Sequence, residues 1–283
     1  MRKHASAYAV GSGALGLLGF ISGDFALQWQ PVPEGIPGRT LLAYANSLIL
    51  LVAAMLVLTP GRSITGALLL ALLNGLYVVL LHLPRVVAAP ADVLPWLGLA
   101  EILSLAAAGL MLALILEGGA RTTLMRATQL VFGTCPVVYG VSHFVYPEFT
   151  ASMIPGWIPA RLFWAYATGV AHVAAGVAIA GAAAVAMARG TGRAPARLVM
   201  LARLAAVLLT VMLGLFTVLV HLTGVAGDPG SRHQWTMLFV ATTLTGAAWI
   251  VSAALYRRTD CSKTDAAESG AQHDAKRQLQ VTN

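Results

Sequence analysis

The sequence predicts an all-α, polytopic membrane protein with about eight transmembrane helices. Hydrophobic residues make up 58% of the 283 positions and charged residues only 10%, too few to cover the surface of a water-soluble domain of this size. Several apolar runs also reach the roughly 20 residues that a helix needs to cross a bilayer. The net charge of +7 sits mainly in the loops between these runs, so it does not indicate nucleic-acid binding.

The expected spans follow one another with short connections. They cover residues 7–26, 41–59, 64–83, 94–116, 125–146, 162–188, 199–222 and 235–256. The first lacks a clear small-residue cleavage site, so we interpret it as a retained helix rather than a signal peptide. Residues 257–283 contain almost no apolar side chains to bury, and we expect them to form a disordered cytoplasmic tail.

Basic residues in the loops orient the chain. One set of loops, with the two ends, carries Arg2, Lys3, Arg62, Arg121, Arg126, Arg189, Arg193, Arg197, Arg203, Arg257 and Arg258. The opposite set carries only Arg39, Arg85, Arg161 and Arg232. The positive-inside rule therefore places both termini in the cytoplasm, in a multi-pass protein of a bacterial-type inner membrane.

The chain also contains an internal repeat. Residues 36–45 match residues 158–167, residues 75–83 match residues 214–222, and Trp96 corresponds to Trp235. Because the matches keep their order, we interpret residues 1–120 and 121–256 as two four-helix units. An even number of helices per unit gives both copies the same orientation in the membrane, so the repeat is expected to be parallel.

Polar side chains in the halves of the spans away from the termini, with one near the midplane, form the candidate ligand-binding site. In the second unit they are His143, Arg161, Tyr166, His172 and His221. A degenerate twin in the first unit would use Asp24, Arg39, Tyr44 and His82. Glu101 is a further buried ionisable residue, about two turns into the fourth span.

His172 is the most informative of these residues. It lies eleven residues beyond Arg161, hence roughly 16 Å deeper and near the midplane of the bilayer. Arg161, Thr168 and His172 share one helix face, which should point into the bundle because ionisable groups avoid lipid. Structural roles stay open for the whole set: histidines can cap helices or anchor at the membrane boundary, arginines can snorkel to headgroups, and tyrosines can simply pack.

Several short motifs stand out in the second unit: Arg126, Gly140-x-x-His143-Phe144, Pro147, Ile158-Pro159, Tyr166-x-x-Gly169 and Gly176. Together they resemble the DoxX family of small bacterial membrane proteins. Family members are typically single four-helix units, so this chain resembles two fused copies, with the better match in the second. In the first copy Asp24-Phe25 stands where the second has His143-Phe144, and His172 occupies the neighbourhood where the family often has a glutamate.

The resemblance implies a link to quinone oxidoreductases or membrane redox complexes, with quinone as the expected ligand and an oxidoreductase complex as the expected partner. Arg161 and Tyr166 would then donate hydrogen bonds to the ligand, and His143 or His172 would carry a proton. No catalytic residue is assigned. A small-solute transporter and a non-catalytic scaffold remain alternatives, because a duplicated chain with a midplane histidine suits transport as well. The oligomeric state stays open.

Two kinds of cofactor site are disfavoured by the sequence. No His-x-x-x-His motif or cysteine-histidine cluster marks a metal site, and haem between His82 and His221 is conceivable only because they lie at equal depth. Gly11-x-Gly13-x-x-Gly16 spells a dinucleotide-binding fingerprint, but it lies inside a membrane span with no strand before it.

Overall fold

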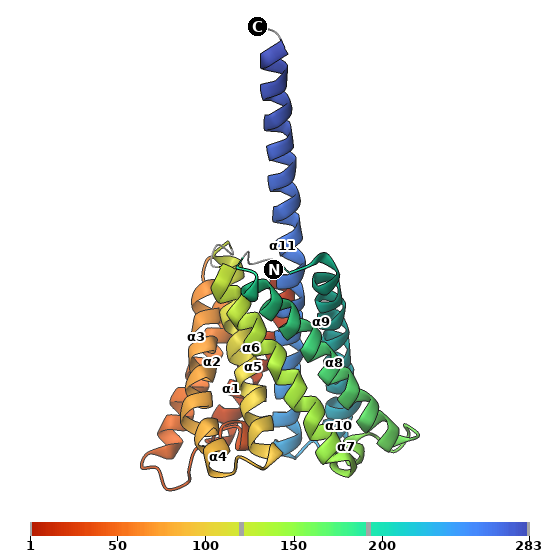
Figure 1. Cartoon of the computed structure of the whole chain (residues 1–283). Helices are drawn as coiled ribbons and strands as arrows, with labels where there is room; N and C mark the ends of the chain where they lie inside the picture. Colours follow the sequence, from red (N-terminus) through yellow and green to blue (C-terminus); the bar gives the residue numbers. More distant parts are fainter. Residues whose placement is uncertain (1, 119–121, 191–193, 282–283) are drawn as a thin grey trace.

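The chain folds into a bundle of long helices, shown in Figure 1. The computed structural model describes residues 2–118, 122–190 and 194–281, and the side chains of residues 4–118, 122–190 and 194–256. Within these ranges every regular element is helical, which confirms the predicted all-α class. The long helices are α1 (Arg2–Ser22), α2 (Arg39–Leu58), α3 (Ser63–Tyr77), α5 (Val93–Leu116), α6 (Thr122–Val145), α8 (Arg161–Ala188), α9 (Ala196–Phe216) and α11 (Arg232–Val281).

Short helical segments connect or extend the long ones. A 3₁₀ turn, η1 (Leu27–Trp29), follows α1, and a short helix α7 (Pro147–Met153) follows α6. Two π-helical segments, η2 (Val78–His82) and η3 (Thr217–Leu222), extend α3 and α9 and lead into α4 (Leu83–Ala88) and α10 (Thr223–Gly227). The two π-helical segments lie in the stretches that the sequence repeat aligns, so the duplicated segments share an uncommon local conformation.

Seven of the described helices, counting consecutive helical segments such as α3, η2 and α4 as one, are long and apolar enough to cross a membrane. The one remaining expected span, at residues 125–146, corresponds to α6, which passes this test only together with α7, across a bend of 98°. Arg126 and Gln129 lower the mean hydropathy of α6, and both side chains are buried in the bundle. The Gln129 side chain bonds both to Arg126 (2.7 Å) and to the Ile179 carbonyl of α8 (3.0 Å), so these polar groups are satisfied inside the bundle.

We expect disorder in residues 257–283, and this stays a prediction; the structure describes residues 257–281 as helical. Helix α11 continues beyond its apolar part to Val281 and projects out of the bundle (Figure 1). Residues 257–281 contain no proline and a single glycine, with many alanine, lysine, glutamine and arginine residues, so local propensity favours continuing the helix. The expected boundary between the two units, at residues 120 and 121, lies outside the described residues.

The eight long helices form a closed ring of neighbours, and two of its members also meet across the middle. Along the ring, α1 contacts α2, then α3, α5, α6, α8, α9 and α11 follow in order, and α11 returns to α1. Helices α5 and α11 also contact each other across the middle. The first four helices of this ring can be exchanged, in order, with the last four. Every pair of ring neighbours then maps onto another such pair, and the α5–α11 pair maps onto itself. A parallel duplication predicts this pattern.

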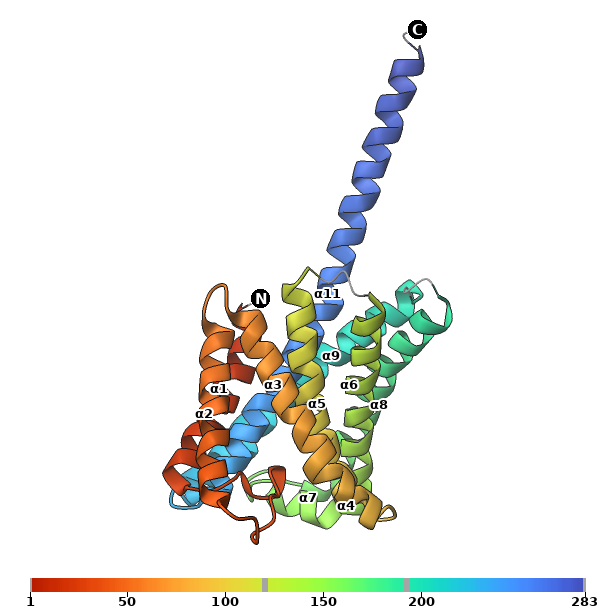
Figure 2. The same ribbon diagram turned by 90° about the vertical axis from the view of Figure 1, so that its left-hand side faces the viewer.

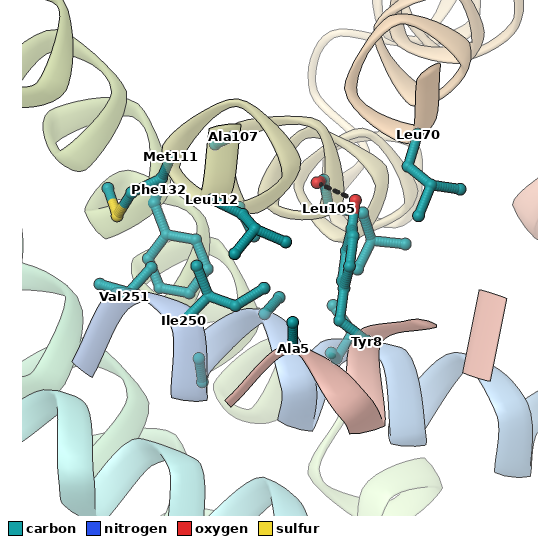
Figure 3. Close-up of a cluster of buried hydrophobic side chains, with 14 of the residues drawn as sticks. Ala5, Tyr8, Leu70, Leu105, Ala107, Met111, Leu112, Phe132, Ile250 and Val251 are labelled. Carbon is teal, nitrogen blue, oxygen red and sulfur yellow. Dashed lines mark hydrogen bonds between the residues drawn. The ribbon is translucent and has the colours of Figure 1, made fainter. Parts of the chain in front are cut away.

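Both chain ends lie on the same side of the bundle, here called the tail side (Figure 1). Helices α4 and α7 lie at the opposite side, here called the far side, as Figure 2 shows. The tail-side half contains a packed apolar core, drawn in Figure 3, that includes Leu70, Met111, Phe132 and Ile250. Within it Tyr8 of α1 donates a hydrogen bond of 2.8 Å to the Leu105 carbonyl of α5.

Helices α6 and α8 approach each other through glycines. A Cβ atom added at Gly140 would lie 2.5 Å from the Gly169 carbonyl oxygen, and one at Gly176 would lie 2.6 Å from the Gly133 carbonyl oxygen. Only glycine tolerates this spacing, which is typical of close helix packing in membranes. Gly11 of the rejected dinucleotide motif is similarly used for packing, because a Cβ there would meet the backbone of Thr243 in α11 at 2.7 Å.

On the far side, a charge cluster ties three helix ends together. Asp24, just after α1, forms ion pairs with Arg39 at the start of α2 and with Arg232 at the start of α11 (3.1 Å). Partial burial alone would raise the pKa of the Asp24 carboxyl. Hydrogen bonds from the Phe25 amide and from the two arginines outweigh that effect and hold this pKa below its ordinary value.

We expect Gly176→Val to lower the melting temperature of the purified protein, because the new side chain must push α6 away from α8. Overpacking of this kind costs about 1–3 kcal/mol. Gly181→Val is the matched control on the same helix, since nothing lies within 4 Å of a Cβ at that position. Thermal unfolding in detergent checks both, and equal melting temperatures for the two variants would contradict the proposed glycine contact.

We expect Asp24→Asn to destabilise the protein near neutral pH by about 1 kcal/mol, because it leaves two arginines without their carboxylate. A group whose pKa is lowered by folding contributes stability above its unfolded pKa and loses it as the pH falls through its folded pKa. The difference in melting temperature between the wild type and Asp24→Asn should therefore shrink as the pH drops below the ordinary range of a carboxyl group. Asp228→Asn, at an exposed far-side carboxylate, serves as the control.

Candidate functional site

A cavity of about 1000 Å³ occupies the far-side half of the bundle. Its walls come from α5, α6, α8, α9 and α11, with contributions from η1, η2 and α7. Most of the lining is apolar, but the polar side chains include Trp29, His82, Glu101, Tyr139, Ser142, His143, Thr168, His172, His221 and His233. Arg85, Asp92 and Tyr146, which lie near the start of α5 and the end of α6, also line the cavity; we call this part of it the mouth.

His143 of α6 and His172 of α8 form the centre of the polar wall. Their ring centroids are 5.1 Å apart, and both side chains line the cavity. The close glycine contact between α6 and α8 produces this pairing, because a Cβ at Gly169 would lie 2.9 Å from the Cβ of His143. The structure places His172 on a face of α8 that points into the bundle, as its spacing predicts, and His143 faces it from α6.

Hydrogen bonds to the backbone determine which ring nitrogen of each histidine carries the proton. Nδ1 of His172 lies 2.9 Å from the Thr168 carbonyl oxygen, and Nδ1 of His143 lies 3.0 Å from the Ala165 carbonyl oxygen. A carbonyl oxygen can only accept, so Nδ1 is the donor in both rings. In the neutral form, Nε2 of each ring is therefore a hydrogen-bond acceptor.

Tyr139 completes this part of the wall. Its ring meets His172 edge to face, with centroids 5.7 Å apart, and its hydroxyl contacts Ser104 Oγ at 2.8 Å. Tyr139 is not among the site residues that the sequence predicted. A pattern could have found it, because Tyr139, Ser142, His143 and Tyr146 follow the three-and-four spacing of one helix face.

A second polar group combines residues of η1, η2 and α5. Trp29 Nε1 donates a hydrogen bond of 2.7 Å to Glu101 Oε2, and the Trp29 carbonyl accepts one from His82 Nε2 at 3.1 Å. Glu101, from the first unit, lines the same cavity as His172, from the second. Trp29 is not among the predicted site residues, since a tryptophan in a short connecting segment carries no spacing pattern of its own.

His221 and His233 line the cavity on the side of α9 and α11. Nδ1 of His221 is buried and has no hydrogen-bond partner among the described residues. His233 is exposed and its ring stacks on Trp29 with centroids 6.3 Å apart. The π-helical turn of η3 places His221 here, as η2 places His82 in the first unit.

An exposed hydrogen bond crosses the mouth of the cavity. The Tyr146 hydroxyl, beyond α6, donates to Asp92 Oδ1, at the start of α5, over 2.8 Å. Hydrogen bonds from the Leu94 amide and then from Tyr146 lower the pKa of Asp92. The bond to this carboxylate in turn raises the pKa of Tyr146.

Two predicted site residues lie away from the cavity. Arg161 borders a separate shallow hollow together with Glu148 and Phe163. The Tyr166 side chain is 44% exposed and stacks on Phe144 on the outer surface. The structure thus gathers His143, His172 and His221 around one cavity and places Arg161 and Tyr166 outside its lining.

The four twin residues of the first unit do not gather around one cavity. Asp24 and Arg39 form the ion pair described above, and Tyr44 stacks on Phe20 as Tyr166 stacks on Phe144. By this geometry the counterpart of Phe144 is Phe20, not Phe25. His82 is the only member of the twin that lines the large cavity.

The space that would hold a second cavity is filled by the segment around η1. Gln30 Oε1 accepts hydrogen bonds from Asn46 Nδ2 (3.1 Å) and from the Ala26 amide (3.0 Å), and the Tyr77 hydroxyl donates to Asn46 Oδ1. These side chains are all buried. The first unit therefore contributes a wall to the site of the second.

Among the described residues, no group of three or more histidine, cysteine, aspartate or glutamate side chains lies close enough to hold a metal ion. Comparison with family models, with curated proteins and with solved structures gives no match for this chain.

Proposed function

We propose that the protein binds one amphipathic small molecule in the far-side cavity, taking it up from the bilayer. A cavity of about 1000 Å³ with a mostly apolar wall and a few polar groups has the size and composition of a small-molecule site. Its polar groups converge from both units, so the intact two-unit chain is needed to build it.

The observation that carries the proposal is the position of one stripe that runs along α9 and η3. Leu204, Leu208, Val211, Leu215, Val218 and Leu222 follow helical spacing and are each between 48% and 58% exposed, so they form an outer, lipid-facing stripe. Three of them, Leu208, Val211 and Leu215, also line the cavity. Residues that belong both to the outer surface and to the cavity wall mark a lateral opening.

The facing side of this opening comes from α8. Trp164 and Ala171 are exposed and line the same cavity. A molecule dissolved in lipid could pass between α8 and α9 and place its polar end against His143 and His172. This route favours a ligand with an apolar body and a compact polar head.

A quinone-type molecule is the ligand class that we propose. It combines an apolar tail with a flat polar ring, and Phe216, tilted against His172 at a centroid distance of 5.9 Å, offers that ring an aromatic surface. The resemblance of the sequence to the DoxX family points to the same class. Under the positive-inside rule the mouth would open to the periplasm of a bacterial-type inner membrane, where an oxidoreductase complex would be the partner.

The packing disfavours transport through the bundle in this conformation. The apolar core of Figure 3 fills the tail-side half, with Leu112 and Ile250 nearly inaccessible to solvent. A transport path would have to cross this core. Arg161 and Tyr166, expected to donate hydrogen bonds to the ligand, would have no direct part in the proposed site.

We expect Ala171→Phe to weaken binding of a short-tailed quinone analogue at least tenfold, because the new ring fills the opening between α8 and α9. Ala174→Phe is the control, since Ala174 is an exposed residue on the same helix that does not line the cavity. Equilibrium binding to detergent-purified protein measures both, and mass spectrometry of extracted lipids identifies any molecule retained from the membrane. Equal affinities for the two variants would place the ligand elsewhere, and no binding of either the oxidised or the reduced analogue to the wild type would reject the quinone class.

A further inference from the structure

The deep part of the cavity has an unusual hydrogen-bond inventory. Each hydroxyl there already donates its hydrogen to the protein: Tyr139 to Ser104 or the Ala100 carbonyl, Ser142 to the Tyr139 carbonyl, and Thr168 to the Trp164 carbonyl at 2.7 Å. Trp29 uses its only side-chain hydrogen on Glu101. These side chains therefore present oxygen lone pairs rather than hydrogens to a ligand.

The two central histidines add to this inventory. Both turn Nδ1 toward backbone carbonyls of α8, so Nε2 lies on the edge of each ring that faces away from that contact. Thr168 Oγ1 lies 3.0 Å from His143 Nδ1, but its own hydrogen goes to the Trp164 carbonyl, so it acts as a second acceptor for the same N–H. In the neutral rings, both Nε2 atoms are acceptors.

The remaining donors of the wall lie elsewhere. Gln28, Arg85, Trp164 and His233 are exposed. His221 offers one donor and one acceptor in its neutral form, and its buried Nδ1 has no partner among the described residues. The polar wall around Tyr139, His143 and His172 is therefore a surface of acceptors.

We propose that this site selects the reduced, hydroxyl-bearing form of its ligand, a hydroquinone or a related phenol, over the corresponding quinone. The inference rests on the proposed function and specifies the ligand class of the same cavity. A hydroxyl group donates its hydrogen to Nε2 of His143 or His172. A quinone carbonyl can only accept, so in the same position it would face another lone pair and leave both groups without a partner.

Selectivity of this kind can be large. A site built to hydrogen-bond a hydroxyl group rejects an analogue without it strongly, because the buried polar groups of the site are then left unpaired. The His143 and His172 pair is well placed to impose it, since His172 is buried and held between Tyr139, His143 and Phe216. Neither ring can turn its Nδ1–H toward the ligand without giving up a backbone hydrogen bond.

The experiment compares three probes with the same short alkyl tail: a hydroquinone, its quinone and its dimethyl ether, titrated anaerobically into the detergent-purified, full-length protein. We expect the hydroquinone to bind at least tenfold more tightly than either of the others. His172→Phe, which keeps a ring but removes the acceptor, should reduce this preference to about twofold or less while the dimethyl ether binds as before. His143→Phe provides a second variant should His172→Phe fail to fold, and His4→Phe, outside the cavity, should keep the wild-type preference.

The outcomes separate the two proposals. Equal binding of all three probes, or tighter binding of the quinone, would overturn the selectivity for the reduced form and leave the cavity as a binding site. No binding of any probe to the wild-type protein would reject the proposed function itself and the selectivity with it. A tenfold preference that persists in both His172→Phe and His143→Phe would show that acceptors other than these histidines determine it.

Discussion

The close contact between α6 and α8 is the constraint on which the site depends. Gly133 and Gly140 on one helix and Gly169 and Gly176 on the other let the two backbones touch, so His143 and His172 meet at a centroid distance of 5.1 Å. In lipid, two helices gain little from burying apolar side chains against each other, and tight packing with internal hydrogen bonds must hold them together. The same glycines that stabilise the pair also bring its two ionisable rings together.

The two units share a plan but use it differently. In the first, the segment after α1 enters the bundle and fills it, with Gln30 and Asn46 satisfying each other and Trp29 reaching Glu101. In the second, α7 follows α6 after a sharp bend and the interior stays open. One copy thus provides a rigid wall and the other provides the cavity, which explains how a duplicated chain can have a single asymmetric site.

The sequence was sufficient for the parts of the structure that depend on composition and local spacing. Apolar runs predicted the helices, and the repeat predicted matched segments, which share the π-helical turns around His82 and His221 and the bonds from Trp96 and Trp235 to the carbonyls of Pro90 and Pro229. Spacing along α8 placed His172 on an inward face. Spacing could not show that the face of Tyr166 turns outward, or that Trp29 folds back onto Glu101, because both depend on how separate helices pack. Helix propensity accounts for the helical form of residues 257–281 in the structure.

The acceptor-rich character of the cavity follows from a general property of polar side chains on membrane helices. A serine or threonine on a helix can donate its hydrogen to a carbonyl of the preceding turn, as Thr168 and Ser142 do here, and a histidine can do the same through Nδ1, as His172 does. In lipid no water is present to take these hydrogens, so the backbone is the nearest partner.

A cavity lined by such side chains is left with lone pairs facing inward. Arginine or lysine would supply donors, but at this depth they would be costly, and Arg85, an arginine that lines the cavity, is exposed. The chemistry that the ligand meets is therefore set by how the helices satisfy their own hydrogen bonds.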